Sequence, residues 1–289
     1  MKRITAFGFI AALMFTLVGC SNSAAVSSSS SEVSSVAPSS SAVAESSKVE
    51  ESSKPVELRL PDVKNTTGKL LIQTVNTSMQ YGLNTYAITS SGGETIIVDP
   101  TAMPKKEVVD LNPVAIVSTH DHGDHTDAAY TDAYECEKIL YKKGEITTKD
   151  FHIYTVASAH SGDEIDEKGT HYCMVIEVDG LRLVHMGDTG QTKLTKDQLK
   201  KLGKIDIAFM QFENSYSDMS LKNEKGFNLA NQLNPTIIVP THYTVVAMPK
   251  FKEKYGEVTK VENKLAISKE ELPEKPLNVY VISNNHKYN

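Results

Sequence analysis

A short cluster of histidines and one aspartate constrains this chain more than any other feature. Three of the nine histidines, His120, His122 and His125, fall within six residues, and Asp124 directly precedes the last of them. In an extended loop, residues two apart project to the same side, so His120 and His122 can hold one ion. We expect Gly123 to allow the change of direction that turns the next two side chains toward a second ion. Four potential ligands so close in sequence therefore predict a site for two metal ions.

Three more potential ligands share a position with this cluster, just after a short apolar run. The cluster follows the run 114–118, and the other three follow the runs 151–156, 181–185 and 236–239. These runs are typical of strands, and rigid strands present residues at their ends for chemistry. Imidazole and carboxylate together suit zinc, or another first-row divalent ion such as manganese or iron. The candidate metal ligands are His120, His122, Asp124, His125, His160, Asp188 and His242.

From about residue 65 onward, short strands alternate with helical stretches. The Asp179-Gly180 pair supplies the positive φ of a tight turn, which predicts a hairpin over 172–185. About 225 residues of this kind suit one domain, which we place at 65–289. Further strands are expected at 69–75, 84–89, 95–99, 205–210 and 279–282, and helices at 193–202 and 226–233.

The first nineteen residues have the features of a lipoprotein signal peptide. Lys2 and Arg3 precede the apolar run 7–18, which is shorter than the roughly twenty residues that span a bilayer. A Leu-Val-Gly sequence then leads into Cys20 and resembles a bacterial lipobox, in which the cysteine is lipidated. Two acyl chains anchor a protein stably, so we expect an extracytoplasmic protein held at the cell membrane through Cys20. The alternative is an ordinary signal peptide followed by a chance cysteine.

Residues 20–56 are expected to form a tether without secondary structure. Sixteen serines lie between residues 21 and 53. Such a segment cannot bury enough apolar surface to offset its chain entropy. The tether would connect the membrane anchor to the folded domain.

The charge of the chain limits its partners. The formal net charge is −6, and removing residues 1–19 takes away two basic residues and no acidic one, which leaves −8. Nucleic acid is not an expected partner, because phosphate contacts need clustered Lys and Arg, whereas a small-molecule substrate is compatible with this charge. The oligomeric state stays open. Cys136 and Cys173 can form a disulfide in an extracytoplasmic protein or remain as two buried thiols.

In chain order, these residues resemble the motifs of the metallo-β-lactamase superfamily. The resemblance runs from Asp99 at a strand end through the histidine cluster, His160, a Gly-Asp pair at Asp188, and His242. It covers about residues 65–285. It implies an α+β fold in a single domain, a four-layer αββα sandwich with the metals at one edge of the two sheets.

The resemblance also implies how the ligands divide between two ions. One ion would be held by His120, His122 and His160, the other by Asp124, His125 and His242, with Asp188 bridging them. The segments 187–190 and 234–243 look most like the branch that includes ascorbate-6-phosphate lactonase and N-acyl-phosphatidylethanolamine phospholipase D. Antibiotic-degrading members have no bridging carboxylate where Asp188 stands, so β-lactamase activity is not expected.

Together these features predict a cell-surface, dinuclear metal-dependent hydrolase. We expect a metal-bridging hydroxide to attack the carbonyl or phosphoryl centre of a lactone, ester or phosphodiester. Asp188, as the bridge, and Asp124, in proton transfer, are the expected catalytic residues. One alternative is a surface metal- or solute-binding lipoprotein without turnover. Another is a redox di-iron centre, which needs an electron-carrying partner domain.

Other polar residues receive mainly structural interpretations. Asp99 is expected to be a buried carboxylate that accepts backbone N–H groups from the metal loop. His185 lies inside a strand and is expected to pack close to the site. The remaining histidines, His152, His171 and His286, are expected on the surface or in the core.

Two further positions can bear on the reaction. Asp121 either assists proton transfer or is solvated in the loop. The segment 213–218 is a candidate lining of the substrate pocket.

Overall fold

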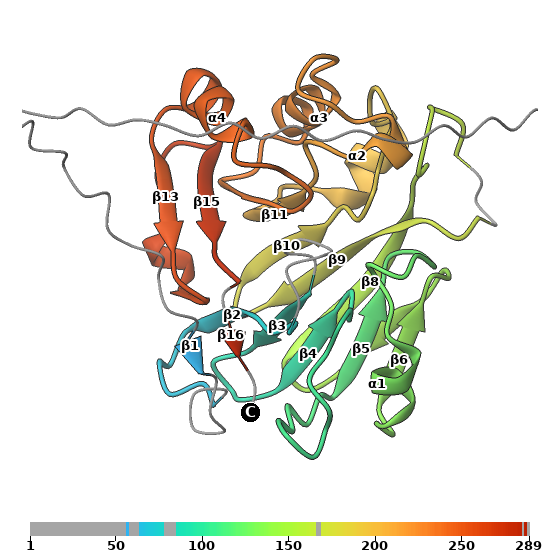
Figure 1. Ribbon diagram of the computed structural model, residues 1–289, viewed down its shortest axis with the longest axis vertical. Coiled ribbons are helices and arrows are strands. Elements are labelled where there is room, and N and C mark those ends of the chain that lie inside the picture. The colour runs from blue at the N-terminus through green and yellow to red at the C-terminus, as the bar shows by residue number, and fades with distance from the viewer. Residues whose placement is uncertain (1–55, 58–63, 78–84, 166–168, 285, 288–289) are drawn as a thin grey trace, which may run out of the picture. The chain divides into compact units, whose positions relative to one another are not determined.

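Two β-sheets packed face to face carry the metal-site loops (Figure 1). The structure is a computed structural model that describes residues 56–57, 64–77, 85–165, 169–284 and 286–287. The expected signal peptide, Cys20 and nearly all of the expected tether lie outside the described residues. Among the described residues, no helix has the length and apolar character needed to cross a membrane.

The smaller sheet has six strands. In spatial order these are β14 (Lys264–Ile267), β2 (Leu70–Thr74), β3 (Tyr86–Thr89), β4 (Thr95–Val98), β5 (Ala115–Ser118) and β6 (Glu137–Leu140). The pairs β4–β5 and β5–β6 are parallel, and the other pairs are antiparallel.

The larger sheet has eight strands. In spatial order these are β13 (Val258–Val261), β15 (Asn278–Ile282), β12 (Ile237–Pro240), β11 (Ile207–Met210), β10 (Leu181–His185), β9 (Tyr172–Val178), β8 (Phe151–Ala157) and β7 (Glu145–Thr147). From β10 to β13 all neighbours are parallel, so the chain leaves β10, β11 and β12 at the same edge of the sheet. A separate two-stranded sheet pairs β1 (Val56–Glu57) with β16 (His286–Lys287) in parallel.

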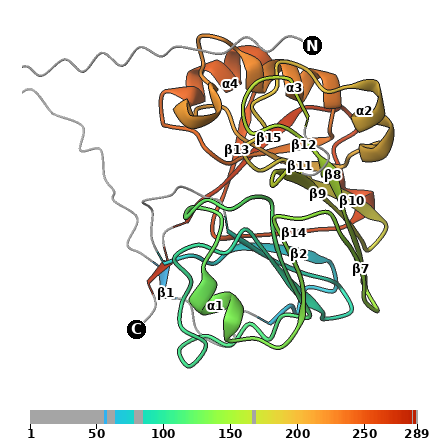
Figure 2. The ribbon, with the colours of Figure 1, turned by 90° about the vertical axis from the view of Figure 1, so that its right-hand side faces the viewer.

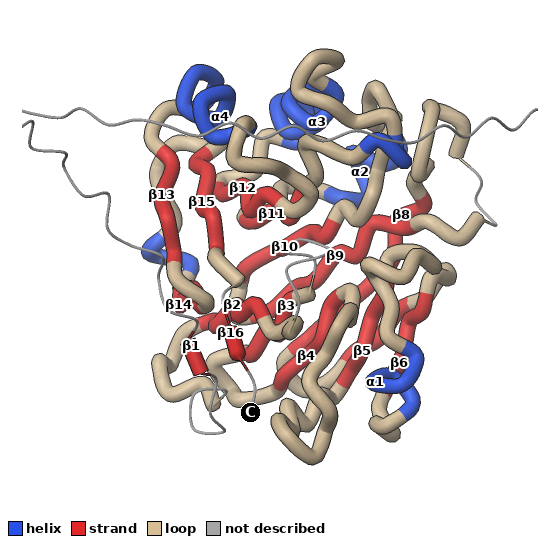
Figure 3. Tube along the Cα trace, in the orientation of Figure 1, coloured by secondary structure: helices blue, strands red, loops and turns tan. Residues whose placement is uncertain are grey.

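Helices cover the outer faces of both sheets, which gives four layers (Figure 2). The longer helices lie together on the larger sheet, as the blue segments of Figure 3 show, and they are α2 (Lys196–Leu202), α3 (Lys225–Leu233) and α4 (Ala247–Tyr255). The smaller sheet is covered by loops and one short helix, α1 (Ala128–Asp132). This arrangement confirms the expected α+β sandwich.

The continuous apolar strands are explained by burial on both faces. In β9, Met174, Ile176 and Val178 pack between the sheets, while Cys173 and Val175 pack under the helices. A strand covered on both sides has no solvent face, so it reads as an unbroken apolar run rather than an alternating one. The Asp179-Gly180 turn after β9 has positive φ at both residues, 50° and 73°, which confirms the predicted hairpin.

Within the two large sheets, the four strands that the sequence pattern does not predict are the outermost ones: β6, β7, β13 and β14. They carry charged residues at exposed positions, so they lack the apolar signature of the central strands. Charged side chains on edge strands also oppose pairing with another chain. Both described cysteines, Cys136 and Cys173, are free thiols, which decides against the disulfide.

Candidate metal centre

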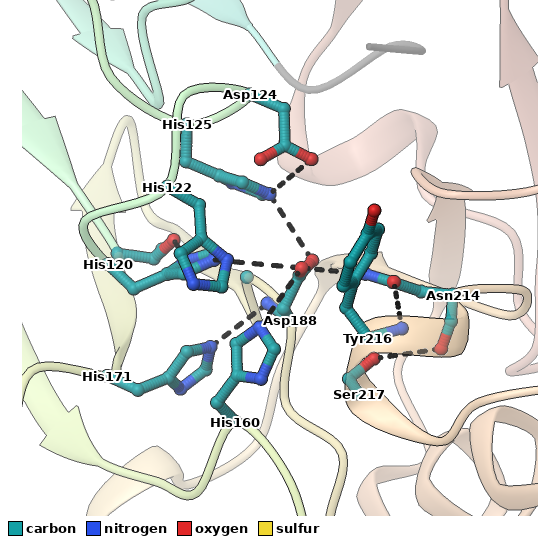
Figure 4. A network of polar contacts seen from close by, with 12 residues as sticks. His120, His122, Asp124, His125, His160, His171, Asp188, Asn214, Tyr216 and Ser217 are labelled. Atoms are coloured by element: carbon teal, nitrogen blue, oxygen red, sulfur yellow. Dashed lines mark hydrogen bonds and ion pairs between the residues drawn. The ribbon is translucent and has the colours of Figure 1, made fainter. Parts of the chain in front are cut away.

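The seven candidate ligands come together where four strands end. The histidine cluster follows β5, His160 follows β8, Asp188 follows β10 and His242 follows β12. Figure 4 shows the histidines arranged around the Asp188 carboxylate. The positions after strands, read from the sequence, therefore correspond to one site in space.

The first group gathers around one oxygen of Asp188. The Nε2 atom of His120 lies 3.6 Å from Asp188 Oδ2, and the Nε2 atom of His160 lies 3.5 Å from the same oxygen. The Nδ1 atom of His122 lies 3.1 Å from His120 Nε2. Three imidazoles and a carboxylate oxygen thus face one point.

The second group gathers around the other oxygen. The Nε2 atoms of His125 and His242 lie 3.3 and 3.2 Å from Asp188 Oδ1, and 3.2 Å from each other. Asp124 Oδ2 lies 3.4 Å from His242 Nε2 and 3.7 Å from His125 Nε2. Asp188 therefore offers one oxygen to each group.

The donor atoms fit divalent cations. Within each group, one ligand atom from every residue lies within 4.8 Å of all the others. Among the described residues, the buried atoms Asp188 Oδ1 and His160 Nε2 make no hydrogen bond. Buried polar atoms are seldom left without a partner, so their convergence indicates a partner of another kind. Imidazole nitrogen and carboxylate oxygen are the donors that zinc and similar ions take.

Asp188 is held on both its side chain and its backbone. The Asn214 side-chain amide donates to Asp188 Oδ2 over 2.7 Å, and the Asp188 backbone N–H donates to His171 Nε2 over 3.0 Å. Since His171 Nε2 accepts, its proton is on Nδ1, which faces Ser158 Oγ at 2.8 Å. Burial raises the pKa of Asp188, but the surrounding histidines outweigh it and hold that pKa well below its usual range.

Asp99 supports the second group from behind. It is fully buried, and it accepts the Thr119 backbone N–H over 2.7 Å, as expected from the sequence, and the Thr119 hydroxyl over 2.8 Å. Its Oδ2 also lies 2.7 Å from His125 Nδ1. Burial raises the pKa of Asp99, yet His185 and His125 lower it to about 2. An ionised carboxylate beside Nδ1 favours the proton on that nitrogen, so His125 Nε2 is the atom that would hold a metal ion.

The other histidines fall in three places. His185 is buried with its ring stacked on Phe209, and its Nδ1 lies 3.4 Å from Asp99 Oδ2, which confirms the expected packing position. His171 is a core residue, but sequence reasoning missed its contact with Asp188. His152 lies on the surface between Glu145 and Glu177. The side chain of His286, in β16, is outside the described residues.

Two glycines next to the ligands have different importance. A Cβ on Gly190 would lie 2.3 Å from the backbone oxygens of both His160 and Ser217, so no side chain fits there. Gly123, by contrast, has no positive φ, and a Cβ there would meet nothing within 4 Å. The change of direction expected at Gly123 therefore does not require a glycine.

The segment 213–218, a candidate pocket lining, reaches the site through Asn214. Its signal in the sequence was its place after β11, the parallel strand between β10 and β12. Asp121 is exposed, in agreement with a solvated loop position.

Comparisons with known proteins agree with this fold and site. The family described as beta-lactamase superfamily domain matches residues 79–242, more than half of the chain. A UPF0173 metal-dependent hydrolase of Natranaerobius thermophilus is 26% identical over 60% of this chain and 88% of its own. A second such hydrolase, from Thermococcus onnurineus, is 27% identical over 59% of this chain and 88% of its own.

A solved structure has the same fold. It is a putative zinc-dependent hydrolase of the metallo-β-lactamase superfamily from Thermotoga maritima, with a TM-score of 0.53 and 21% identity over 74% of this chain and 98% of that one. The family match, the αββα layers and the strand-end ligands agree with one another. This chain belongs to the metallo-β-lactamase superfamily.

Proposed function

We propose that this protein hydrolyses a lactone, an ester or a phosphodiester at the cell surface, using two divalent ions. Both relatives described above are named metal-dependent hydrolases, and this chain is a metal-dependent hydrolase of the same superfamily. The observation that carries the proposal is Asp188, a single carboxylate with one oxygen in each of two ligand groups. A protein that only captured one ion would have no use for this duplication.

The metals have a defined chemical task. Ions bound in these two groups would polarise a carbonyl or phosphoryl oxygen and lower the pKa of a bound water toward neutrality. Zinc is the first candidate, with manganese or iron as alternatives, because His and Asp ligands accept all three.

The protein's own groups divide between fixed and exchanging positions. The Asp188 side chain is 2% exposed and is fixed by Asn214 and by its backbone bond to His171. The Asp124 side chain is 25% exposed and lies in the second group. Asp124 is therefore the carboxylate that solvent can reach. Asp188 fixes the position of the two ligand groups relative to each other.

The bridging carboxylate also bears on the reaction. Its place between the groups favours the lactone, ester and phosphodiester reactions over β-lactam hydrolysis, as the resemblance implied. Substrate panels can test this choice directly.

The test of activity uses the full-length chain purified in mild detergent and loaded with Zn²⁺ or Mn²⁺. We expect two ions per chain and hydrolysis within a panel of esters, lactones, thioesters and phosphodiesters, with loss of both turnover and one ion in His122→Ala. A single ion per chain, or no His122-dependent hydrolysis anywhere in the panel, would contradict the proposal.

The cell-surface location needs a separate test. Lipidation at Cys20 predicts that the protein fractionates with membranes and incorporates labelled palmitate in cells, and that Cys20→Ala abolishes both. A wild-type protein that remains in the soluble fraction without label would refute the anchor and leave the hydrolase proposal intact.

A further inference from the structure

Most of the exposed large hydrophobic side chains lie in two loops that also supply residues to the metal centre. Among the described residues, four such side chains are exposed: Val108 at 40%, Tyr216 at 84%, Val245 at 82% and Val246 at 63%. The last three lie in the two loops that also supply Asn214 and His242 to the site. We call Tyr216, Val245 and Val246 the apolar rim.

These two loops are tied to each other. The His242 carbonyl oxygen accepts the backbone N–H groups of Phe212 and Glu213, each over 2.9 Å. Glu213 Oε2 accepts the backbone N–H of Thr244 over 2.7 Å and its hydroxyl over 2.8 Å. Hydrogen bonds therefore hold together the two loops that carry the rim residues.

Two hydrogen bonds connect the Tyr216 backbone to the bridging carboxylate through the Asn214 side chain. Asn214 Oδ1 accepts the Tyr216 backbone N–H over 3.0 Å, while the Asn214 amide donates to Asp188. Figure 4 shows Tyr216 together with Asn214, which carries this contact. The backbone of Tyr216 is therefore held one hydrogen bond away from Asn214, the residue that contacts the bridging carboxylate.

The ligand groups open toward solvent through four of their members. His122 is exposed, and the side chains of Asp124, His160 and His242 are 25%, 24% and 15% exposed, whereas His120, His125 and Asp188 are at most 3% exposed. His242, on the open side, lies three residues before Val245. A substrate whose reacting group meets the ions from that side would have its remainder near the apolar rim.

The loops offer no partner for an additional anionic group. The segments 213–218 and 242–246 contain no Lys or Arg, and they contain the acidic residues Glu213 and Asp218. The nearby Lys225 is buried, and its ammonium group is bonded to the Gly190 carbonyl and the Asp218 carboxylate. An uncharged apolar group is therefore the complement of this surface.

We propose that the apolar rim is a specificity subsite that binds an uncharged acyl or aryl part of the substrate. The inference rests on the proposed function and narrows it to substrates with such a group. Three side chains are too few for a protein partner, since a stable interface buries about 800 Å² on each side. A small apolar group matches their extent.

Straight-chain carboxylates test the subsite without requiring turnover. Acetate, butyrate and octanoate, below the micellar range, carry the same metal-binding head and differ only in apolar length. Their Kd values are measured by calorimetry on the zinc-loaded full-length chain. We expect octanoate to bind at least about tenfold more tightly than acetate, because each sequestered methylene adds affinity.

Variants then assign the effect to the rim. Tyr216→Ser combined with Val245→Ser is expected to reduce the ratio of the acetate and octanoate Kd values to below about threefold. Both residues are more than 80% exposed, so the fold is expected to be retained, with circular dichroism as the check. Val108→Ser, an exposed valine outside the two loops, is the matched control and keeps the wild-type ratio.

The outcomes separate this inference from the proposed function. Equal affinity for all three carboxylates in the wild type, or an unchanged ratio in the double variant, would overturn the subsite even if the protein hydrolyses esters. Chain-length-dependent binding that the double variant loses would support the subsite even if the activity panel fails.

Discussion

Asp99→Asn is expected to weaken one of the two metal positions selectively. The substitution keeps the size of a fully buried side chain and removes its charge. One oxygen can still accept the Thr119 backbone N–H. The amide nitrogen, however, takes the place of Oδ2 and faces His125 Nδ1, which lies 2.7 Å away. Two donors would then oppose each other, so His125 is expected to move its proton to Nε2, the atom that faces Asp188 and His242.

The magnitude follows from the hydrogen bond that is lost. A hydrogen bond to a charged group contributes about 1.5–3 kcal/mol, and replacing the partner of a metal-ligating histidine costs about 10- to 100-fold in metal affinity. The larger loss is expected in the group of Asp124, His125 and His242, because His125 contacts Asp99 directly, whereas His120 reaches Asp99 only through the Thr119 hydroxyl.

Chelator competition measures this effect. Zinc is withdrawn from the purified protein by a chromophoric chelator, and the two dissociation constants are compared between wild type and Asp99→Asn. Asp121→Asn is the control, since Asp121 is an exposed aspartate in the same loop. An equal weakening of both ions, or no weakening of either, would refute the assignment of Asp99 to His125.

The remaining predictions concern packing, support of the bridge and pH. Gly190→Ala is expected to destabilise the fold by about 1–3 kcal/mol, because the new Cβ would meet two backbone oxygens. Gly123→Ala is the control, since a Cβ there would meet nothing within 4 Å. Urea unfolding compares the two variants, and equal unfolding midpoints would refute the steric argument. Asn214→Ala removes the side-chain amide that donates a hydrogen bond to Asp188 and is expected to lower zinc affinity about tenfold. The same chelator measures the affinity. Asn223→Ala, at an exposed asparagine, is the control. The Glu177 and Glu145 carboxylates accept hydrogen bonds from the His152 ring and raise its pKa. The contribution of His152 to stability is therefore present below the unfolded pKa of about 6.5 and is lost as pH rises through the folded pKa. His152→Gln should therefore cost about 0.2–1 kcal/mol in urea unfolding at pH 5.5 and nothing at pH 9, and an equal loss at both pH values would contradict the charge-based explanation.

Several inner strands of the two sheets were predictable, because they bury both faces. The segments 114–117, 172–176 and 237–239 are unbroken apolar runs, and each forms most of a strand. The outermost strands were not predictable in this way, since a charged edge strand such as β13, with sequence Val-Thr-Lys-Val, has little apolar pattern. Helix α4 was also not predicted, and its exposed lysines mask the two buried residues, Ala247 and Phe251.

The site was predictable where a residue type has a restricted use, and not elsewhere. Histidine and aspartate after a strand indicated the ligands, and Asp99 was recognised because a carboxylate at a strand end can accept backbone N–H groups. The role of His171 depends on its Nε2 meeting the backbone N–H of Asp188, seventeen residues away in sequence. A contact with a backbone atom leaves no trace in the residue type of its partner. The same applies to Gly190, whose necessity comes from two carbonyl groups of distant loops.

The parallel pairing of Val56 with His286 and of Glu57 with Lys287 has a mechanical consequence. If residues 20–56 tether the protein to a membrane, a pull on the tether enters the domain at β1. A load directed along β1 would be carried by both of its pairs with β16 together instead of opening them one at a time. The pairing with β16 would then keep traction on the tether from reaching β2, the next strand that the structure describes.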